Sequence, residues 1–325
     1  MRTRKTESRY IAAAAAVGLH AKPSKVAPPT HCTETIGLEF DGRELTVGVS
    51  VPKLQRLCDD TQSIIDRRWC TGEDLSRIVG RWTWAMLVRR PALAIFSSVY
   101  RFIEAAGRVA FAVWPSVERE LAVAIGLAPL LFASVADGWC SNVVASDASM
   151  EGMGVVAAPV THAVVAEVAR DRAMPGSQDP EHYQAVAPAP RAAIAVAQAA
   201  PVPRPPPPAQ LADVQWTTIV SSRWEREEHI NALELRAAMT AVRWALSSSS
   251  AMNSRLLLLC DSSAVLGALS KGRSSSVLLL RRCRRMSAWL LASGLRLFMR
   301  WVPTEWNPAD APSRAFHGRS SPPRW

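Results

Sequence analysis

An uninterrupted apolar run, Leu256–Cys260, constrains the fold of this chain more than any other stretch. A strand that leaves one face to water alternates polar and apolar residues, whereas a continuous run predicts a central strand covered on both faces. The run ends at Asp261. Because ligands of open α/β sheets bind outside the carboxyl ends of the strands, Asp261 is a candidate site residue. The alternative is an aspartate that merely begins the following helix.

A second acid, Asp147, is the last residue of another short strand of the buried type, Val143–Asp147. An aspartate that leaves a strand into a glycine-bearing turn is commonly a turn former, so this explanation stands beside a functional one. Gly152 and Gly154 are likewise predicted to be turn glycines, because they are too sparse for a phosphate-binding loop.

The third and fourth acids fall at predicted helix starts. Asn231 is predicted to be an N-cap, which puts Glu234 in the first turn and makes a capping box the simplest account of it. Asn307 and the proline after it have the pattern of an N-cap and first helical residue, and Asp310 then lies in the first turn. Each acid has a structural explanation alone. Their order along the chain is the informative feature.

The charge of the chain favours a polyanionic partner. It has 38 Lys+Arg against 28 Asp+Glu, a formal net charge of +10, and the excess is mostly arginine, which suits phosphate forks. A merely solvated basic surface is the alternative. One predicted helix presents arginines largely on its outside, as a phosphate-tracking ridge or a solvated face would: Arg281, Arg282, Arg284 and Arg285.

Composition divides the chain into four parts. Residues 1–32 are predicted to be disordered or ragged, and 33–130 to form a mainly helical region with an N-terminal hairpin at Asp41-Gly42. Residues 138–317 are predicted to form an α/β domain, interrupted by a proline- and alanine-rich insertion at 174–213. A disordered tail is expected at 318–325.

Within the helical region, Pro91 and Pro115 are predicted to open helices, with Glu118 and Glu120 in the first turn of the second. Cys58-Asp59-Asp60 superficially resembles the paired aspartates of a polymerase palm. Those need a tight hairpin between strands, whereas the periodicity here puts both acids on the solvent face of a helix. No polymerase active site is expected in this chain.

The six cysteines are scattered without a C-x-x-C pair, which disfavours a disulfide framework or a zinc site and favours an intracellular compartment, either cytoplasm or nucleus. The longest apolar run, Leu121–Val135, contains a proline and falls short of the roughly 20 residues of a spanning helix. A membrane is therefore not an expected partner.

Four motifs in this order give the chain a resemblance to a known family. They are Ser146-Asp147-Ala148-Ser149 with Gly152 and Gly154, His229 to Leu235, Leu259 to Ser263, and Val302-Pro303 through Asn307 to Arg314. Residues from about 140 to 317 resemble the ribonuclease H domain of retrotransposon reverse transcriptases, most of all the DIRS-like group. The stretch from about 51 to 125 is similar, less specifically, to the segment that connects polymerase and nuclease in such enzymes.

The resemblance implies a ribonuclease H-like fold, with a mixed five-stranded sheet flanked by helices and preceded by a mainly helical connection region. It implies that Asp147, Glu234, Asp261 and Asp310 are catalytic and hold two Mg²⁺ ions, with Mn²⁺ as the alternative. The expected activity is hydrolysis of the RNA strand of RNA–DNA hybrids. A polymerase portion outside this chain is a further expected partner.

The resemblance also suggests nucleic-acid contacts. The RNA strand is expected near Asn231 and the turn at Ser262 and Ser263, and phosphates near Arg281, Arg282 and Arg285. Two features depart from the family: Val302–Trp306 supplies no histidine before the last acid, and the long insertion is atypical. The alternative function is a catalytically inactive retroelement remnant that only binds nucleic acid.

Overall fold

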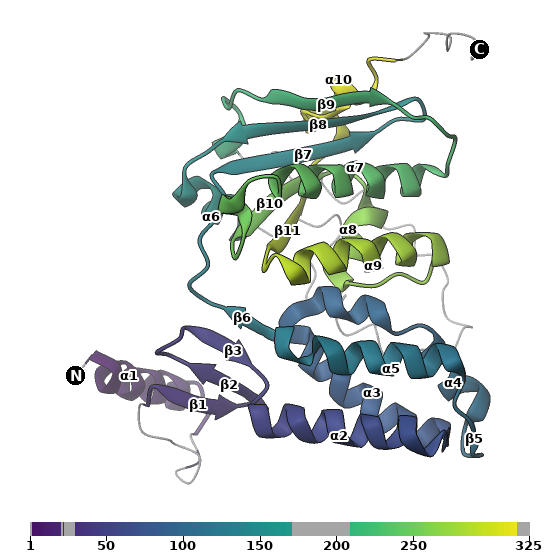
Figure 1. The fold of residues 1–325 in the computed structure, drawn as a ribbon. Coiled ribbons are helices and arrows are strands. Elements are labelled where there is room, and N and C mark those ends of the chain that lie inside the picture. The colour runs from purple at the N-terminus through teal and green to yellow at the C-terminus, as the bar shows by residue number, and fades with distance from the viewer. Residues whose placement is uncertain (1, 21, 23–29, 171–208, 317–325) are drawn as a thin grey trace.

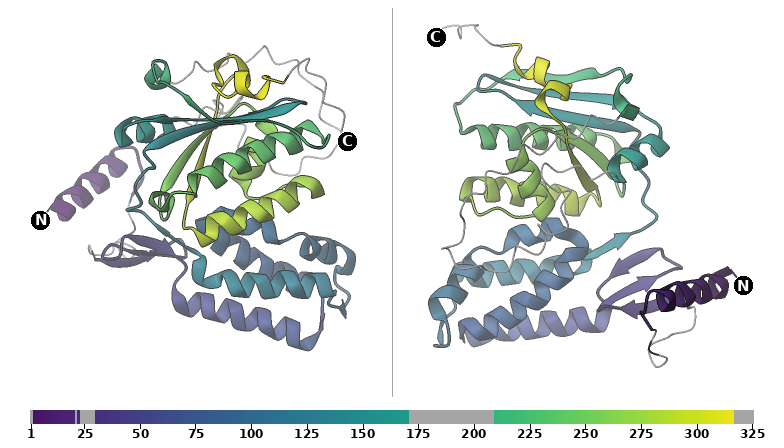
Figure 2. Two further views of the ribbon diagram at one scale, coloured as in Figure 1. Left: turned by 45° about the horizontal axis from the view of Figure 1, so that its top comes forward. Right: turned by 180° about the vertical axis from the view of Figure 1, so that it is seen from behind.

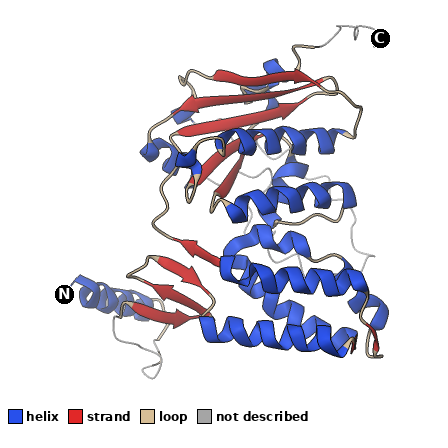
Figure 3. Ribbon diagram, in the orientation of Figure 1, coloured by secondary structure: helices blue, strands red, loops and turns tan. Residues whose placement is uncertain are grey.

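The computed structural model describes residues 2–20, 22, 30–170 and 209–316 of the 325-residue chain. Figures 1 and 3 show a helical half, built from the first part of the sequence, and a half that contains the larger sheet. The predicted insertion at 174–213 and the tail at 318–325 lie almost entirely outside the described residues. The end of the insertion is described: Leu211, in the short 3-10 helix η5 (Ala209–Leu211), is buried in the core of the sheet.

The first element corrects an expectation, because Arg2–Ala16 forms a helix, α1, where no order was predicted. Its last residues are a run of alanine, the best helix former, and this local propensity accounts for the helix.

A small antiparallel sheet follows, and it is larger than the predicted hairpin. The Asp41 carboxylate accepts hydrogen bonds from the backbone N–H groups of Arg43 and Glu44, which closes the expected turn. A second turn at Ile36 and Gly37, both with positive φ, adds a strand that the sequence analysis did not predict. In spatial order the strands are β1 (Cys32–Thr35), β2 (Leu38–Asp41), β3 (Thr46–Gly48) and β6 (Phe132–Ser134).

The helical half packs four α-helices and two 3-10 segments around one apolar cluster that contains Trp82 and Phe102, both fully buried. Its elements are α2 (Val51–Arg67), α3 (Gly72–Met86), η2 (Leu87–Ile95), α4 (Ser98–Ala106), α5 (Pro115–Leu127) and η3 (Ala128–Leu130), with the short strands β4 (Trp69–Cys70) and β5 (Phe111–Ala112) paired at one end. A capping box between Thr71 and Asp74 opens α3.

Two predictions in this half are wrong in detail. Pro91 does not open an α-helix, because it lies inside η2, and the next helix begins only at Ser98. Of the two acids predicted in the first turn of α5, only Glu118 lies there, and Glu120 follows it. Glu120 is buried, and it accepts the backbone N–H groups of Ser97, Ser98 and Val99 at 2.8, 3.0 and 3.0 Å. A carboxylate from α5 thus caps α4, whose own N-cap serine makes no side-chain cap.

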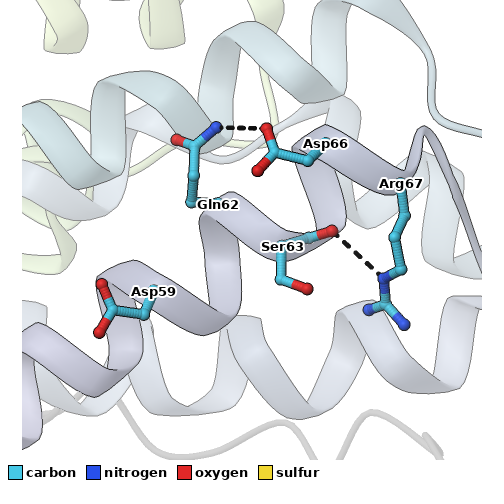
Figure 4. Close-up of a pocket in the computed structure, with 5 residues that line it drawn as sticks. All are labelled: Asp59, Gln62, Ser63, Asp66 and Arg67. Carbon is cyan, nitrogen blue, oxygen red and sulfur yellow. Dashed lines mark hydrogen bonds between the residues drawn. The ribbon is translucent and has the colours of Figure 1, made fainter.

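Asp59 and Asp60 lie in the middle of α2 and are exposed, as the periodicity predicts. Figure 4 shows the shallow pocket beside Asp59, in which the Gln62 amide donates to Asp66 at 2.8 Å along the same helix. Asp60 forms an ion pair with Arg81 of α3 at 2.7 Å. Asp60 and Asp66 thus interact with neighbouring surface side chains.

The second half contains a mixed five-stranded sheet, so the α/β class predicted from the sequence is confirmed. The spatial order is β11-β10-β7-β8-β9, in which β7, β8 and β9 are antiparallel neighbours and β10 and β11 run parallel to β7. The strands are β7 (Asn142–Ala148), β8 (Gly152–Pro159), β9 (Thr217–Arg223), β10 (Arg255–Cys260) and β11 (Arg296–Trp301).

Helices cover both faces of this sheet, as the continuous apolar run of β10 requires. Leu257 and Leu259 of β10 belong to one apolar cluster and Leu256 and Leu258 to another, because successive side chains point to opposite faces. Figure 2 shows α10 on the side of the sheet opposite to α7. The helices are α6 (His162–Arg170), α7 (Ile230–Ala245), α8 (Ser263–Lys271), α9 (Val277–Ala292) and α10 (Asp310–Ser313), with the 3-10 turns η6 (Ser249–Ala251) and η7 (Thr304–Trp306).

The helix α9 lies between α7 and the helical half (Figure 1). Arg284 of α9 does not face solvent freely as predicted: it donates to the carbonyl of Ala94 at 2.9 Å, to that of Ile95, and to Glu120 at 2.9 Å. In the reverse direction Arg89 of η2 is buried and donates to the carbonyl of Leu290, near the end of α9, at 2.7 Å. Charged hydrogen bonds therefore join the two halves in both directions.

All six cysteines are free thiols. Among the described residues, every helix is too short or too polar to cross a membrane.

Candidate metal centre

The strand β7 carries Asp147 into the interior. The strand continues to Ala148, one residue beyond Asp147, so the aspartate is part of the ladder and not of the turn that follows. It is 3% exposed, and its Oδ2 accepts a hydrogen bond from the Ser313 hydroxyl of α10. The pKa of Asp147 is raised to about 6, first by burial and further by the neighbouring carboxylates of Asp261 and Asp310.

Gly152 and Gly154 let α10 approach β8, which corrects their assignment as turn glycines. Both lie in β8 itself. A Cβ on Gly154 would lie 2.3 Å from the carbonyl oxygen of Ala309, and one on Gly152 would lie 3.0 Å from that of Ser313. The helix that carries Asp310 therefore packs on a strip of bare backbone.

Glu234 is not a capping residue. The helix α7 begins at Ile230 with His229 as its N-cap, whose Nδ1 accepts the backbone N–H of Asn231 at 3.2 Å, so the predicted cap at Asn231 is wrong. Because of this shift Glu234 is the fifth residue of α7 and lies beyond the first turn. The structural explanation that competed with a functional one no longer applies.

The Glu234 side chain is instead half-buried, with one carboxylate oxygen in need of a partner. Its Oε2 is inaccessible to solvent and has no hydrogen-bond partner among the described residues. The pKa of Glu234 is raised to about 9, first by burial and then by the carboxylates of Asp147 and Asp261. A buried carboxylate without a donor is costly, so a bound cation would relieve this side chain.

Asp261 follows β10, as predicted, and two side chains fix it. Its Oδ2 accepts the Thr304 hydroxyl at 2.7 Å and its Oδ1 accepts the Asn307 amide at 3.2 Å. The Asn307 amide also donates to the carbonyl of Ser146 at 3.2 Å, and its Oδ1 accepts the backbone N–H of Ala309 at 3.1 Å. Asn307 thus ties β7, Asp261 and α10 together, but it is not the N-cap that its pattern predicted, because the N-cap of α10 is Ala309.

Asp310 is the first residue of α10, and its Oδ1 accepts the Arg314 Nε at 2.7 Å. The four predicted acids therefore come from four separate elements. The charges of Asp261 and Asp310 help to raise the pKa of Asp147, and those of Asp147 and Asp261 help to raise the pKa of Glu234. Glu234, Cys260 and Asp261 each place one potential ligand atom within 4.8 Å of the others. Cys260, which the sequence analysis did not single out, is buried, and burial first raises the pKa of its thiol.

This arrangement can hold a divalent cation. Crowded carboxylates repel one another in the absence of a counter-ion, and the raised pKa values of Asp147 and Glu234 express that repulsion together with burial. The oxygen donors match the preference of hard cations, while the Cys260 thiol is a soft donor at the margin of the set.

The residues predicted to contact nucleic acid differ in their exposure and in their hydrogen bonds. Ser262 is the N-cap of α8, accepting the backbone N–H of Val265 at 3.4 Å, and Ser263 is exposed beside it. Asn231 lies at the start of α7 and is partly buried.

The three arginines of α9 differ in their surroundings. Arg282 forms an ion pair with Glu228, while Arg285 stacks over Trp289 of its own helix at 5.5 Å. Arg281 is exposed. The interactions of Arg282 and Arg284 with protein groups mean that the row of four is not a continuous free ridge.

Residues around the acids were missed because their roles depend on contacts across the fold. Ser313 lies 166 residues from Asp147, and Asn307 lies 46 from Asp261. The one local signal was the proximity of Ser313 and Arg314 to Asp310 within the last motif.

No protein-family model matches the chain, and no curated protein matches it. Solved structures with some similarity are foamy viral protease-reverse transcriptase chains bound to nucleic acid. One (dRH) is in complex with double-stranded DNA, with 12% identity, 84% of this chain and 38% of that chain covered, and a TM-score of 0.29. A second, also with double-stranded DNA, has 13% identity, 85% and 46% coverage and a TM-score of 0.28. A third, with an RNA/DNA hybrid, has 13% identity, 86% and 51% coverage and a TM-score of 0.25.

The chain spans about half, or less, of the length of these structures. At such TM-scores the similarity defines no residue correspondence.

Proposed function

We propose that this chain is a metal-dependent ribonuclease H-type endonuclease that hydrolyses the RNA strand of RNA–DNA hybrids, as part of a retroelement reverse transcriptase of the DIRS-like group. The observation that carries the proposal is the grouping of one potential ligand atom each from Glu234, Cys260 and Asp261 within 4.8 Å of one another, beside Asp147, whose pKa the charges of Asp261 and Asp310 help to raise. Among the described residues the Glu234 Oε2 has no hydrogen-bond partner, which supports a cation there. The sheet order supports it: three antiparallel strands with two parallel strands added beside the first is the arrangement that the ribonuclease H-like fold would have.

The residues present fit a pair of Mg²⁺ ions. The four carboxylates would hold them, since Mg²⁺ prefers oxygen ligands and uses few protein carboxylates. Two divalent cations supply activation of the attacking water and stabilisation of the leaving oxygen in phosphodiester hydrolysis.

The protein's own contribution is to orient the carboxylates. Thr304 and Asn307 fix both oxygens of Asp261, and Ser313 fixes Asp147. Residues that hydrogen-bond a metal-binding carboxylate in this way hold it in the orientation that metal binding requires.

The direct test is cleavage of a hybrid labelled on its RNA strand, with double-stranded DNA and double-stranded RNA as controls. We expect cleavage only of the hybrid and only with Mg²⁺ or Mn²⁺. Glu234→Gln should lower the rate by at least about a hundredfold, because a lost ligand removes several kcal/mol of charge stabilisation. Glu227→Gln is the matched control, since Glu227 is exposed and lies one turn before α7.

Activity that survives Glu234→Gln would overturn the mechanism. Binding of the hybrid without metal-dependent cleavage would instead support an inactive remnant that only binds nucleic acid.

A further inference from the structure

Arg314 is a cation built into the cluster of acids. It lies four residues after Asp310 and donates its Nε to Oδ1 at 2.7 Å. Throughout the described part of the chain, no other lysine or arginine forms an ion pair with any of the four acids. The pKa of Arg314 is raised, first by its hydrogen bond to Asp310, then by the charge of Asp310, and also by the carboxylates of Asp147 and Asp261. Three of the four acids therefore interact electrostatically with its guanidinium.

The same guanidinium has unused donors. Only its Nε is engaged, and among the described residues neither Nη atom has a hydrogen-bond partner. The Arg314 side chain is 51% exposed, against 27% for Asp310, so its outer edge faces solvent beside the acids. A planar guanidinium with both Nη amino groups free matches the oxygens of a phosphate.

We propose that Arg314 has two successive partners. Without a metal it is the counter-ion of Asp310, and when a cation takes Asp310 its guanidinium binds a phosphate of the hybrid held at the site. This inference rests on the proposed function, and it deepens that function by naming a residue that positions the substrate.

The two partners give Arg314 opposite effects on metal and substrate. As a counter-ion it competes with a cation for the Asp310 oxygen, so its removal should strengthen metal binding. As a phosphate ligand it holds the nucleic acid, so its removal should weaken substrate binding. An ordinary surface ion pair would do neither, because exposed pairs of this spacing contribute little.

The experiment uses the full chain with Arg314→Ala, Arg314→Lys and Arg77→Ala. The last is the matched control, since Arg77 forms the same i,i+4 ion pair with Glu73, also at 2.7 Å, on the surface of α3. Mn²⁺ affinity is measured by calorimetry without nucleic acid, and KM and kcat are measured on the labelled hybrid.

For Arg314→Ala we expect Mn²⁺ to bind about twofold to fivefold more tightly, the scale of an exposed ion pair. KM should rise about tenfold or more, the scale of a charged hydrogen bond, with kcat changed by less than about threefold. Arg314→Lys keeps the charge but loses the planar fork, so Mn²⁺ affinity should stay near that of the wild type while KM still rises. Arg77→Ala should change none of these quantities.

Unchanged or weaker Mn²⁺ binding in Arg314→Ala, or an unchanged KM, would overturn the role of Arg314 and leave the proposed function standing. A wild-type chain that binds no Mn²⁺ would overturn both. Circular dichroism of each variant checks that the fold is retained, and Arg314→Lys keeps the test decisive if Arg314→Ala fails to fold.

Discussion

The half-buried carboxylate of Glu234 makes the stability of the metal-free protein depend on pH in a predictable direction. Its pKa is raised to about 9 in the folded protein. A carboxyl whose pKa rises on folding binds its proton more tightly when folded, so its stabilising contribution is complete below the pKa of the unfolded chain. That contribution is lost as the pH rises toward the folded pKa.

Within one pH range, the titration of Glu234 dominates the pH dependence of stability. Asp147, with a folded pKa of about 6, has largely lost its proton above that value and contributes little further slope. One proton costs about 1.4 kcal/mol per pH unit, so the wild type in EDTA should lose about 2 kcal/mol between about pH 6.5 and about pH 8. Glu234→Gln keeps the volume and removes the titration, and should lose that much less over the same range.

The assay is urea unfolding of both proteins at several pH values, in EDTA and in excess Mg²⁺. Mg²⁺ should flatten the slope of the wild type, because a cation favours the ionised carboxylate. Glu227→Gln carries the same cysteines and histidines and should follow the wild type. Equal slopes for the wild type and Glu234→Gln in EDTA would refute the account of Glu234 as a half-buried, unpartnered acid.

Three further substitutions test the packing around the site. Gly154→Ala puts a methyl group 2.3 Å from a backbone oxygen just before α10, so it should destabilise the fold by about 1–3 kcal/mol in urea and reduce cleavage. Gly126→Ala, where a Cβ meets open space, is its control. Asn307→Ala frees the Asp261 carboxylate and should weaken Mn²⁺ binding about tenfold to a hundredfold by calorimetry, with the helical circular dichroism retained. Glu120→Gln should cost about 2–3 kcal/mol in urea, since it removes a buried charge shared by a helix start and an arginine, while Mn²⁺ affinity stays unchanged.

Contradictory outcomes are equally clear for these variants. A Gly154→Ala protein as stable as the Gly126→Ala control would mean that α10 does not rest on bare backbone. Wild-type Mn²⁺ affinity in Asn307→Ala would remove that residue from the support of the site. No loss of stability in Glu120→Gln would show that the carboxylate is dispensable to the junction of the two halves.

The position of Asp261 in the fold could be predicted from the sequence, because the acid directly follows a recognisable strand. Asp261 follows an apolar run whose burial on both faces is visible in the residues themselves, so both the strand and its end could be located. Glu234 was placed in the right helix for an incorrect reason. The start of α7 is two residues earlier than the Asn231 pattern suggests, because the imidazole of His229 accepts the hydrogen bond that a polar cap residue ordinarily would.

The supporting residues could not be predicted because their partners are distant in sequence. Nothing near Ser313 indicates that its hydroxyl meets Asp147, and nothing near Gly154 indicates that a helix more than 150 residues later lies on it. Glu120 illustrates the same limit in the helical half, where a helix N-terminus from another segment turns a predicted first-turn acid into a buried cap. Local patterns locate elements, and tertiary contacts decide what their side chains do.

The position of α9 has a consequence for how the protein opens and how it could be divided. A cut between β6 and β7 would separate the sequence cleanly, yet it would strip Leu291 of its apolar neighbours and remove the arginine that satisfies the Leu290 carbonyl. An isolated sheet half would therefore expose the apolar face of α9 that packs on the helical half, and this face would favour aggregation. In the intact chain both halves pack against α9, and neither can unfold without losing those contacts. The backbone amides of α9 should therefore be among the slowest to exchange with deuterated solvent.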